Sequence, residues 1–319
     1  MSKSVRVVIL GDLLYDCFVW ADHLPRMGET VTGYANGFYS GGKGANQAVQ
    51  AARLGAEVYM IGKVGVDERG TFLIDSLKSS GVNTDYVITD ANEATGTDCV
   101  QIDRNGNNAI VVVPLANEHI RPEEIEGMAS LIGSADVFIS QLQVNEEAIE
   151  AALRLAHGAG VRTVLNPAPA RKMPDAFFSL PDYLTPNETE AEFFTGCYQK
   201  DMDMQAWRTA AAKRFFEMGA RRLVITLGAQ GALYCEGGES FVVPPYPVKA
   251  LDTTAAGDAF NAAFAIRLAQ GADVRAALAY GNAAGALTAS RMGSQPSMPT
   301  VQEMDNFISE RETQQRKGQ

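Results

Sequence analysis

Short runs of apolar residues alternate with segments of helical periodicity along most of the chain. The segment 145–160 shows the helical spacing, because one face carries Ile149, Ala152, Leu153 and Ala156. The apolar runs are rich in Val and Ile, as in strands buried inside a parallel sheet. These runs lie at 5–11, 57–62, 136–140, 162–166 and 222–228. The alternation predicts an α/β fold with a doubly wound, mostly parallel sheet flanked by helices.

Two segments depart from this alternation and predict antiparallel strands. The second contains Asn105-Gly106, a pair that is typical of hairpin turns, between two runs of β-formers. We expect inserted strands within 13–42 and 95–115 to form a small antiparallel β lid over one edge of a single domain, 1–319. A small sheet with an exposed apolar face favours a partner, so we expect a homodimer through the lid.

Composition narrows the classes of partner. The 319 residues include 27 basic and 38 acidic side chains, and this net charge of −11 argues against nucleic acid and anionic membranes as partners. The four cysteines form no CxxC pair, and the three histidines lack metal-ligand spacing. We therefore expect a cytoplasmic protein with reduced thiols that acts on a small molecule.

The segment 248–271 carries the strongest chemical signal. It predicts a strand, a tight turn of small residues and a helix that starts near Gly257. The small residues Ala255, Ala256 and Gly257 let a ligand approach the backbone, and N–H groups at a helix start favour an anion. Asp258 either caps this helix or acts as a base beside a bound phosphate. The pairing of an anion cradle with an acid favours phosphoryl transfer.

Two weaker signals follow other predicted strands. Asn187 and Glu190 lie at a helix start, where they indicate a capped helix with acid in its first turn. Beside a phosphate site, Glu190 would instead hold Mg²⁺ through water. Gly228 and Gly231 form a turn at a strand end, which is where open α/β sheets bind ligands.

A glycine cluster precedes the first predicted helix. Gly37, Gly42 and Lys43 have the spacing of a phosphate-binding loop, but Gly44 stands where that loop needs Ser or Thr for Mg²⁺. A dinucleotide-binding pattern fails too, because no third glycine follows. With Lys43 and Asn46, the glycine N–H groups suit a polyhydroxy ligand instead.

The chain resembles the ribokinase family, also called the PfkB family of sugar and nucleoside kinases. Two signatures carry the resemblance: GGKGANQA at 41–48 and DTTAAGDAF at 252–260. Further matches occur in the family's order at 166–170, 185–192, 225–228 and 293–299, so that the resemblance spans about residues 5–310.

The resemblance implies a role for each matching position. Asp258 would be the catalytic base, with the backbone of Ala255, Ala256 and Gly257 as the anion hole. The sugar would be held by Asp16, Gly42, Lys43 and Asn46. Mg²⁺ and phosphate would be held by Asn187 and Glu190, and ATP by Thr226, Gly228, Gly231 and Asn282. An activating K⁺ would be held, in part through carbonyl oxygens, by Asp252, Thr254, Thr288, Arg291, Gly293 and Ser297.

Two positions depart from the family pattern in the sugar site. Leu14 stands where ribokinases carry a sugar-binding Asn, and Gln143 stands where they carry a sugar-contacting Glu. Both changes weaken the case for D-ribose but not for a kinase. We therefore expect ATP-dependent phosphorylation of a primary hydroxyl of a pentose or related sugar. The alternatives are a nucleoside kinase, with Leu14 and Tyr15 as a wall for the base, and a non-catalytic sugar-binding protein.

Overall fold

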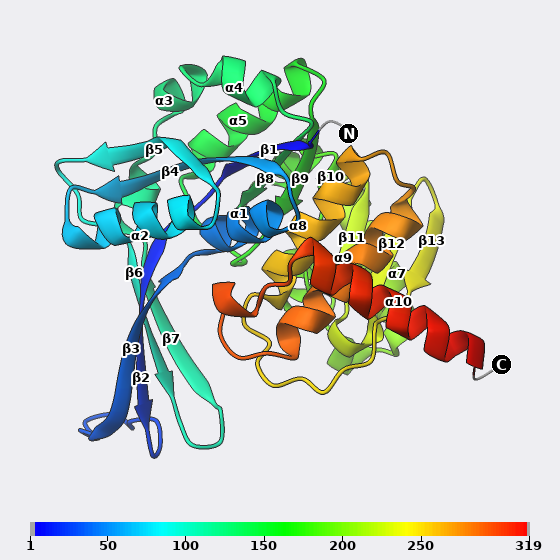
Figure 1. The fold of residues 1–319 in the computed structure, drawn as a ribbon. Coiled ribbons are helices and arrows are strands. Elements are labelled where there is room, and N and C mark those ends of the chain that lie inside the picture. The colour runs from blue at the N-terminus through cyan, green and yellow to red at the C-terminus, as the bar shows by residue number, and fades with distance from the viewer. Residues whose placement is uncertain (1–3, 318–319) are drawn as a thin grey trace.

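The computed structural model describes residues 4–317, and a twisted sheet runs through the middle of the molecule (Figure 1). Neighbours from β11 to β5 are parallel, whereas β12 and β13 add an antiparallel edge. In the described residues the strand order is β13 (Glu239–Val243), β12 (Ala232–Glu236), β11 (Leu223–Thr226), β10 (Tyr183–Leu184), β9 (Arg162–Asn166), β8 (Val137–Gln141), β1 (Arg6–Leu10), β4 (Glu57–Gly65) and β5 (Asn83–Asp90).

Helices cover both faces of this sheet, which confirms the doubly wound prediction. Because side chains alternate along a strand, Val7 and Ile9 of β1 enter one core and Val8 and Leu10 enter the other. The first core contacts α1 (Lys43–Arg53), α2 (Glu68–Ser79), α8 (Ala256–Ala269), α9 (Val274–Ala289) and α10 (Val301–Lys317). The second contacts α3 (Pro122–Glu126), α4 (Ala129–Gly133), α5 (Glu146–Gly158), α6 (Glu188–Thr195) and α7 (Met204–Glu217). Short 3₁₀ helices are η1 (Leu115–His119), η2 (Asp175–Ser179), η3 (Gln199–Asp201), η4 (Gly228–Gln230) and η5 (Gln295–Ser297).

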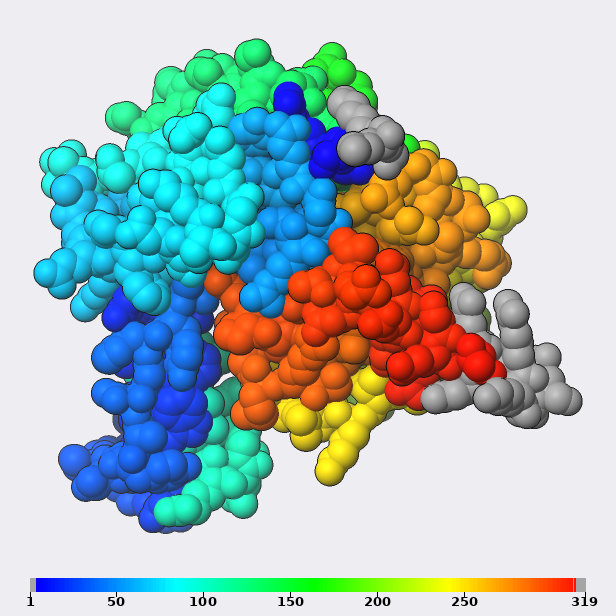
Figure 2. Space-filling view, in the orientation of Figure 1, coloured from blue at the N-terminus to red at the C-terminus, as the bar shows by residue number. Residues whose placement is uncertain are grey.

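A second sheet of four strands stands apart from the main body (Figures 1 and 2). Its order is β3 (Gly33–Gly41), β2 (Leu14–Ala21), β6 (Thr97–Ile102) and β7 (Asn108–Val113). Each hairpin, β2–β3 and β6–β7, is antiparallel, and Asn105-Gly106 lies in the turn of the second. The central pair β2–β6 is parallel, so the sheet is mixed rather than wholly antiparallel. Both hairpins start at the main sheet, and their first strands therefore run in the same direction.

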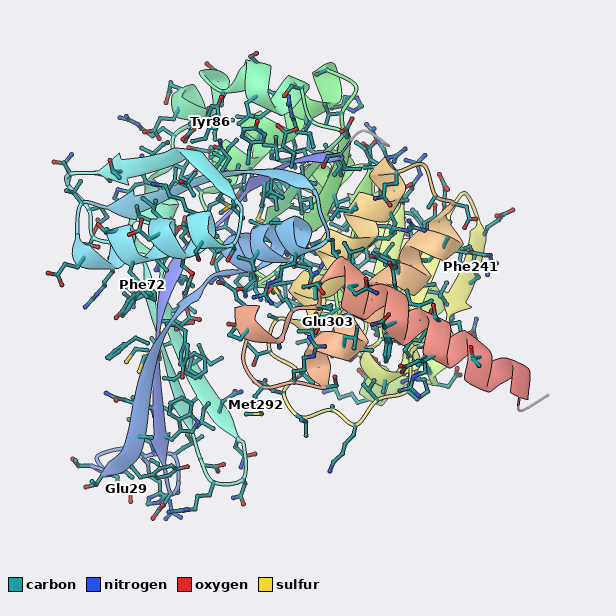
Figure 3. The ribbon with its side chains drawn as sticks, in the orientation of Figure 1. Glu29, Phe72, Tyr86, Phe241, Met292 and Glu303 are labelled. Atoms are coloured by element: carbon teal, nitrogen blue, oxygen red, sulfur yellow. The ribbon has the colours of Figure 1, made fainter. Side chains whose placement is uncertain are left out.

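Apolar side chains are exposed on both faces of the small sheet. Phe38 and Tyr39 are neighbours in β3, and Ile110 and Val111 are neighbours in β7, so each pair contributes to opposite faces. Phe72 of α2 (Figure 3) contacts Tyr15 of β2 edge to face, which joins this sheet to the main body. Among residues 4–317, none of the helices is both long and apolar enough to cross a bilayer.

The strand predicted at the start of 248–271 is absent. Residues 244–255 form an irregular segment instead, and α8 begins at Ala256. Pro244, Pro245 and Pro247 remove three donors just before it, which disfavours a continued strand ladder. The amides of Leu251 and Asp252 donate to the carbonyl oxygen of Ala289 at the end of α9. This pairing with a helix end replaces the pairing with a neighbouring strand.

Candidate active site

The carboxyl ends of β1, β8 and β9 meet the first turns of α1 and α8. Asp12 follows β1, Gln141 ends β8 and Asn166 ends β9, while Gln47 and Asp258 come from the two helices. Each of these side chains is at least nine-tenths buried. Open α/β sheets bind their ligands at this edge, so these residues define the candidate site.

The glycine cluster connects β3 to α1 and packs against the segment that follows β1. Gly42 adopts the left-handed region with φ of 95°, and a Cβ atom on Gly44 would lie 2.7 Å from the backbone nitrogen of Asp12. The Asp12 carboxylate accepts hydrogen bonds from the amides of Lys43 (3.2 Å) and Gly44 (2.9 Å). An internal carboxylate therefore already occupies the anion position at this helix start, which agrees with the rejection of a phosphate loop here. Burial raises the pKa of Asp12 to about 6.

Asp258 sits in the first turn of α8 but does not cap it. No side chain caps this helix, and the Asp258 carboxylate instead accepts from Asn46 Nδ2 (3.1 Å) and Gln47 Nε2 (3.0 Å). Burial raises the pKa of Asp258, while Lys43 and the two amides oppose that rise. The capping alternative is therefore wrong, because this carboxylate is paired with two side-chain amides and not with the backbone of its own helix.

A chain of side-chain amides orients the two donors to Asp258. Asn46 Oδ1 accepts from Gln295 Nε2 at 3.2 Å, and Gln47 Oε1 accepts from Gln141 Nε2 at 2.6 Å. Because the oxygen of each amide is already paired, its NH₂ group must point at Asp258. The sequence analysis missed Gln47, although it follows Asn46 in the same signature, and it also missed Gln141 and Gln295, which lie far away in the chain.

The segment before Asp258 forms an open turn. Ala255 adopts a left-handed conformation with φ of 59°, and the amide of Ala256 donates to the carbonyl oxygen of Thr253. Gly257 is exposed, and a Cβ atom there would meet nothing within 4 Å. The start of α8 is thus uncapped, accessible and adjacent to a buried acid, which are the properties of an anion site beside a base.

Asn187 and Glu190 form a reciprocal capping box at the start of α6. Asn187 Oδ1 accepts from the Glu190 amide, and the Glu190 carboxylate accepts from the amide and the side chain of Asn187, all within 2.9 Å. The capped-helix interpretation therefore holds. Burial also raises the pKa of Glu190 to about 7, and Lys43 and Asp258 both act on it electrostatically, so that this carboxyl lies within range of the same site.

The predicted nucleotide-binding residues lie at the end of β11 and on α9. Thr226 forms an isolated parallel bridge with Asn187, which connects this region to the capping box. Gly228 and Gly231 both have positive φ, and a Cβ atom on Gly231 would collide with the carbonyl oxygen of Val243. Asn282 Nδ2 donates to the carbonyl oxygens of Val243 (3.1 Å) and Pro244 (3.0 Å).

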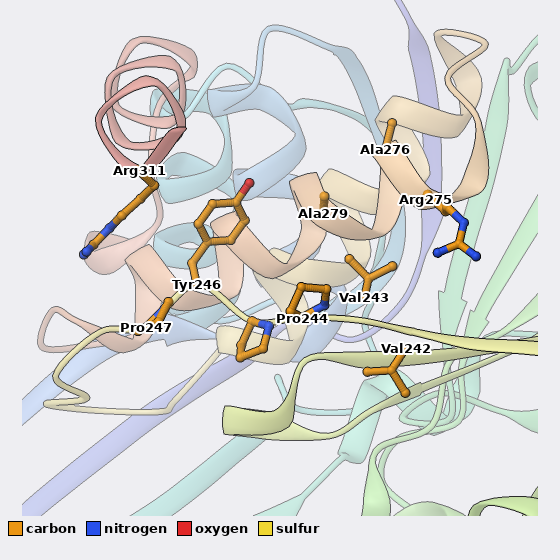
Figure 4. A pocket seen from close by; sticks show the side chains of 10 residues that line it. Val242, Val243, Pro244, Tyr246, Pro247, Arg275, Ala276, Ala279 and Arg311 are labelled. Carbon is orange, nitrogen blue, oxygen red and sulfur yellow. The ribbon is translucent and has the colours of Figure 1, made fainter. Parts of the chain in front are cut away.

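Val243 and Pro244 also border a cavity of about 650 Å³. Figure 4 shows apolar side chains from the end of β13, from the segment after it and from α9 around the cavity, together with two arginines. The lining consists of residues 242–247 with Arg275, Ala276, Ala279 and Arg311. Such a cavity suits a flat apolar ring with a charged substituent.

Asp252 connects the two segments predicted to hold K⁺. Its carboxylate accepts from the amides of Thr254 and Gly293, each at 3.0 Å. The Arg291 guanidinium group donates to Glu303 at 2.7 Å and to the carbonyl oxygen of Ser297 at 3.4 Å. Thr288 is fully buried with its hydroxyl oxygen unpaired, and the Ser297 hydroxyl donates to the carbonyl oxygen of Ser294.

The lid side of the site holds Leu14, Asp16 and Gln143, all buried. Leu14 packs over Gly96, and Asp16 packs against Gly41, where a Cβ atom would lie 1.9 Å from its carboxylate. Oδ1 of Asp16 and Oε1 of Gln143 have no hydrogen-bond partner. Tyr15 points to the opposite face and stacks on Phe38 at 5.6 Å, so it does not form the wall that a nucleoside base would need.

Comparisons with known proteins agree with this geometry. The family profile described as pfkB family carbohydrate kinase matches residues 5–301. The chain is 39% identical over 304 residues to a ribokinase of Bacillus subtilis, covering 95% of this chain and 99% of that protein. It is 33% identical over 304 residues to a deoxyribokinase of Salmonella typhi, covering 95% and 98%. The structure of Arabidopsis thaliana ribokinase with ribose and ATP superposes with a TM-score of 0.86, at 28% identity, covering 96% and 99%.

Proposed function

The chain belongs to the pfkB family of carbohydrate kinases, and we propose that it transfers the γ-phosphoryl group of ATP to a primary hydroxyl of a pentose or related sugar. The observation that carries this proposal is the Asp258 carboxylate, which is buried, hydrogen-bonded by Asn46 and Gln47, and adjacent to the uncapped start of α8. Binding alone does not need an acid at that position. The ribokinase and deoxyribokinase relatives support a pentose as the acceptor.

The reaction follows from this arrangement. The sugar hydroxyl gives its proton to Asp258 as its oxygen forms a bond to the γ-phosphorus, and the bond to the leaving ADP oxygen breaks with its electron pair. The N–H groups at the start of α8 stabilise the negative charge on the transferred group. Lys43 acts on both Asp258 and Glu190 and adds positive charge to the same region.

Glu190 and Asn187 would hold Mg²⁺, whose chemistry is to neutralise the phosphate oxygens. The fit rests on Glu190, a buried carboxyl that Lys43 and Asp258 influence. Mg²⁺ keeps most of its own waters, so one or two carboxylates suffice. K⁺ would be held between the segments around Thr254 and Gly293, whose amides both donate to Asp252. A cation there would order the turn before α8.

ATP would bind across the end of β11 and the middle of α9. Thr226, Gly228, Gly231 and Asn282 would contact it, and the apolar cavity beside Val243 and Pro244 is the space we assign to the adenine ring. The small sheet, within 13–42 and 95–115, acts as a lid over the sugar. Its exposed apolar side chains favour pairing with the lid of a second copy, and the four free thiols favour the cytoplasm.

A screen of ATP consumption over pentoses, deoxy sugars, hexoses and nucleosides tests this proposal. ADP formation that depends on one sugar, together with the phosphorylated sugar in the mass spectrum, supports it. A nucleoside as the best acceptor supports the second candidate, which the orientation of Tyr15 disfavours. Sugar binding by calorimetry without any ADP formation contradicts the kinase proposal and supports a binding protein.

A further inference from the structure

The lid carries a second carboxyl group beside Asp16. In the parallel pair β2–β6, Asp98 is the direct partner of Asp16, so both side chains point to the same face of the lid. Asp16 is 6% exposed, and its Oδ1 atom has no hydrogen-bond partner. Oδ1 of Asp98 is buried and unpartnered as well. The two carboxyl groups form a side-chain hydrogen bond with each other, and the Oδ1 atom of each remains without a partner.

Acidic groups act on Asp16 in the described part of the chain. The groups that act on Asp16 are Asp98 and Asp12, both acidic. Lys43 acts on Asp12, Asp258 and Glu190 but is absent from the groups that act on Asp16. Burial and the neighbouring carboxyl raise the pKa of Asp16 to about 9, and burial raises that of Asp98 to about 6. The pair therefore shares a proton in the free protein, while one oxygen of each carboxyl group stays without a partner.

The pair is continuous with the active site. Asp12, which acts on Asp16, is bonded to the amides of Lys43 and Gly44 and also interacts electrostatically with Asp258. The Asp16 carboxylate also packs against Gly41, which directly precedes Gly42 and Lys43 in the chain. A purely structural role does not explain the pair, because two buried acids without a cation destabilise a fold.

We propose that Asp98 is a specificity-determining residue which, together with Asp16, binds a part of the sugar that offers at least two hydrogens to donate. This inference rests on the proposed kinase function. Two adjacent hydroxyls satisfy the pair, and so does one ammonium group on an amino sugar. Leu14, on the same strand as Asp16, stands where ribokinases carry a sugar-binding Asn. The polar contact that the Asn would make is therefore made by Asp98 instead. A sugar acid should bind poorly, because its carboxylate would lie beside the carboxyl groups of Asp16 and Asp98 and like charges repel.

The test compares wild type with Asp98→Asn, which keeps the side-chain shape and removes the charge. Asp22→Asn is the matched control, because Asp22 is an exposed carboxyl of the same lid, 65% accessible and paired with Arg104. The acceptors are the best neutral sugar, its deoxy analogue lacking one of the adjacent hydroxyls, the corresponding amino sugar and the corresponding sugar acid. Thermal melting of each variant shows that it is folded.

We expect Asp98→Asn to raise the sugar KM about 10- to 100-fold, the range for loss of a hydrogen bond to a charged group, with kcat within about threefold. The variant should also show a smaller difference in KM between the sugar and its deoxy analogue. Its KM for the sugar acid should be lower than that of wild type. A wild-type preference for the amino sugar, lost in the variant, identifies the ammonium form. A preference for the neutral sugar identifies the diol form.

A KM for Asp98→Asn within twofold of both wild type and Asp22→Asn overturns the proposal. Equal rejection of the sugar acid by all three proteins overturns it too. If wild type shows no sugar-dependent turnover at all, the kinase proposal fails separately. Calorimetric titration of the same sugars with the wild type and the two variants then decides whether Asp98 binds sugar.

Discussion

Replacing Asp258 with Asn exchanges one carboxylate oxygen of the proposed catalytic base for an NH₂ group. The carboxylate accepts one hydrogen bond on each oxygen, from Asn46 and Gln47. Neither amide can turn around, because their oxygens already accept from Gln295 and Gln141. The NH₂ group of the new Asn must therefore point at the NH₂ group of Asn46 or of Gln47, so that two donors face each other and neither has an acceptor there.

Two opposing effects set the stability of this variant. The unmatched donors destabilise the fold by about 1–3 kcal/mol. Removal of a buried carboxylate, whose pKa burial has raised, opposes this loss. We expect a net change below about 2 kcal/mol, or a Tm shift of a few degrees for a chain of this size. Loss of the base should lower kcat by at least about 10²- to 10⁴-fold.

The assay is coupled ADP release at saturating ATP and sugar, with calorimetric titration of both ligands and a thermal melt. Sugar and ATP affinities should stay close to those of wild type. Asp203→Asn is the control, because Asp203 is an exposed residue that caps α7 and Asn caps a helix equally well. The catalytic role of Asp258 would be refuted if the variant kept more than about a tenth of wild-type kcat. That activity is well above what is expected to remain after loss of a base.

Four further outcomes are expected. Turnover should rise in K⁺ relative to Na⁺ or a large organic cation, because Asp252 ties together the two segments beside α8; equal rates at fixed ionic strength contradict this. Leu14→Asn should raise kcat/KM for ribose relative to the best other sugar by about 5- to 150-fold, and a wild-type preference for ribose above about tenfold shows that Leu14 does not face the sugar. Mg²⁺ affinity should fall from pH 8 to pH 6, because the pKa of Glu190 is about 7 and a protonated carboxyl binds cations poorly; Glu190→Gln should remove this dependence. The free energy of unfolding of the ligand-free protein should be higher at pH 6 than at pH 9. The pKa values of Glu190 and Asp16 are raised to about 7 and 9, so the stabilisation present at low pH is lost as the pH rises through them, and equal stabilities would contradict the burial of these acids.

Local patterns were sufficient for the architecture. Apolar runs rich in β-branched residues predicted the parallel strands, and the spacing of Ile149 and Leu153 predicted α5, because each pattern reports which face of one element is buried. Asn105-Gly106 predicted the β6–β7 hairpin, because this pair favours the backbone of a tight turn. The turn of small residues predicted a helix that starts near Gly257, and α8 begins at Ala256. In each case the responsible residues are neighbours in the chain.

Tertiary structure decided the relations between distant segments. The predicted strand before α8 was wrong, because the amides of Leu251 and Asp252 pair with the end of α9 rather than with a strand. Gln47 reaches Asp258 across 211 positions, and Asp98 meets Asp16 only because β2 and β6 pair in parallel and in that register. Register shifts of one residue reverse every side chain on a strand, and packing of the two hairpins on the main body selects one register. The composition of each segment determined its own structure, whereas the pairing of two segments was determined by the fold that brings them together.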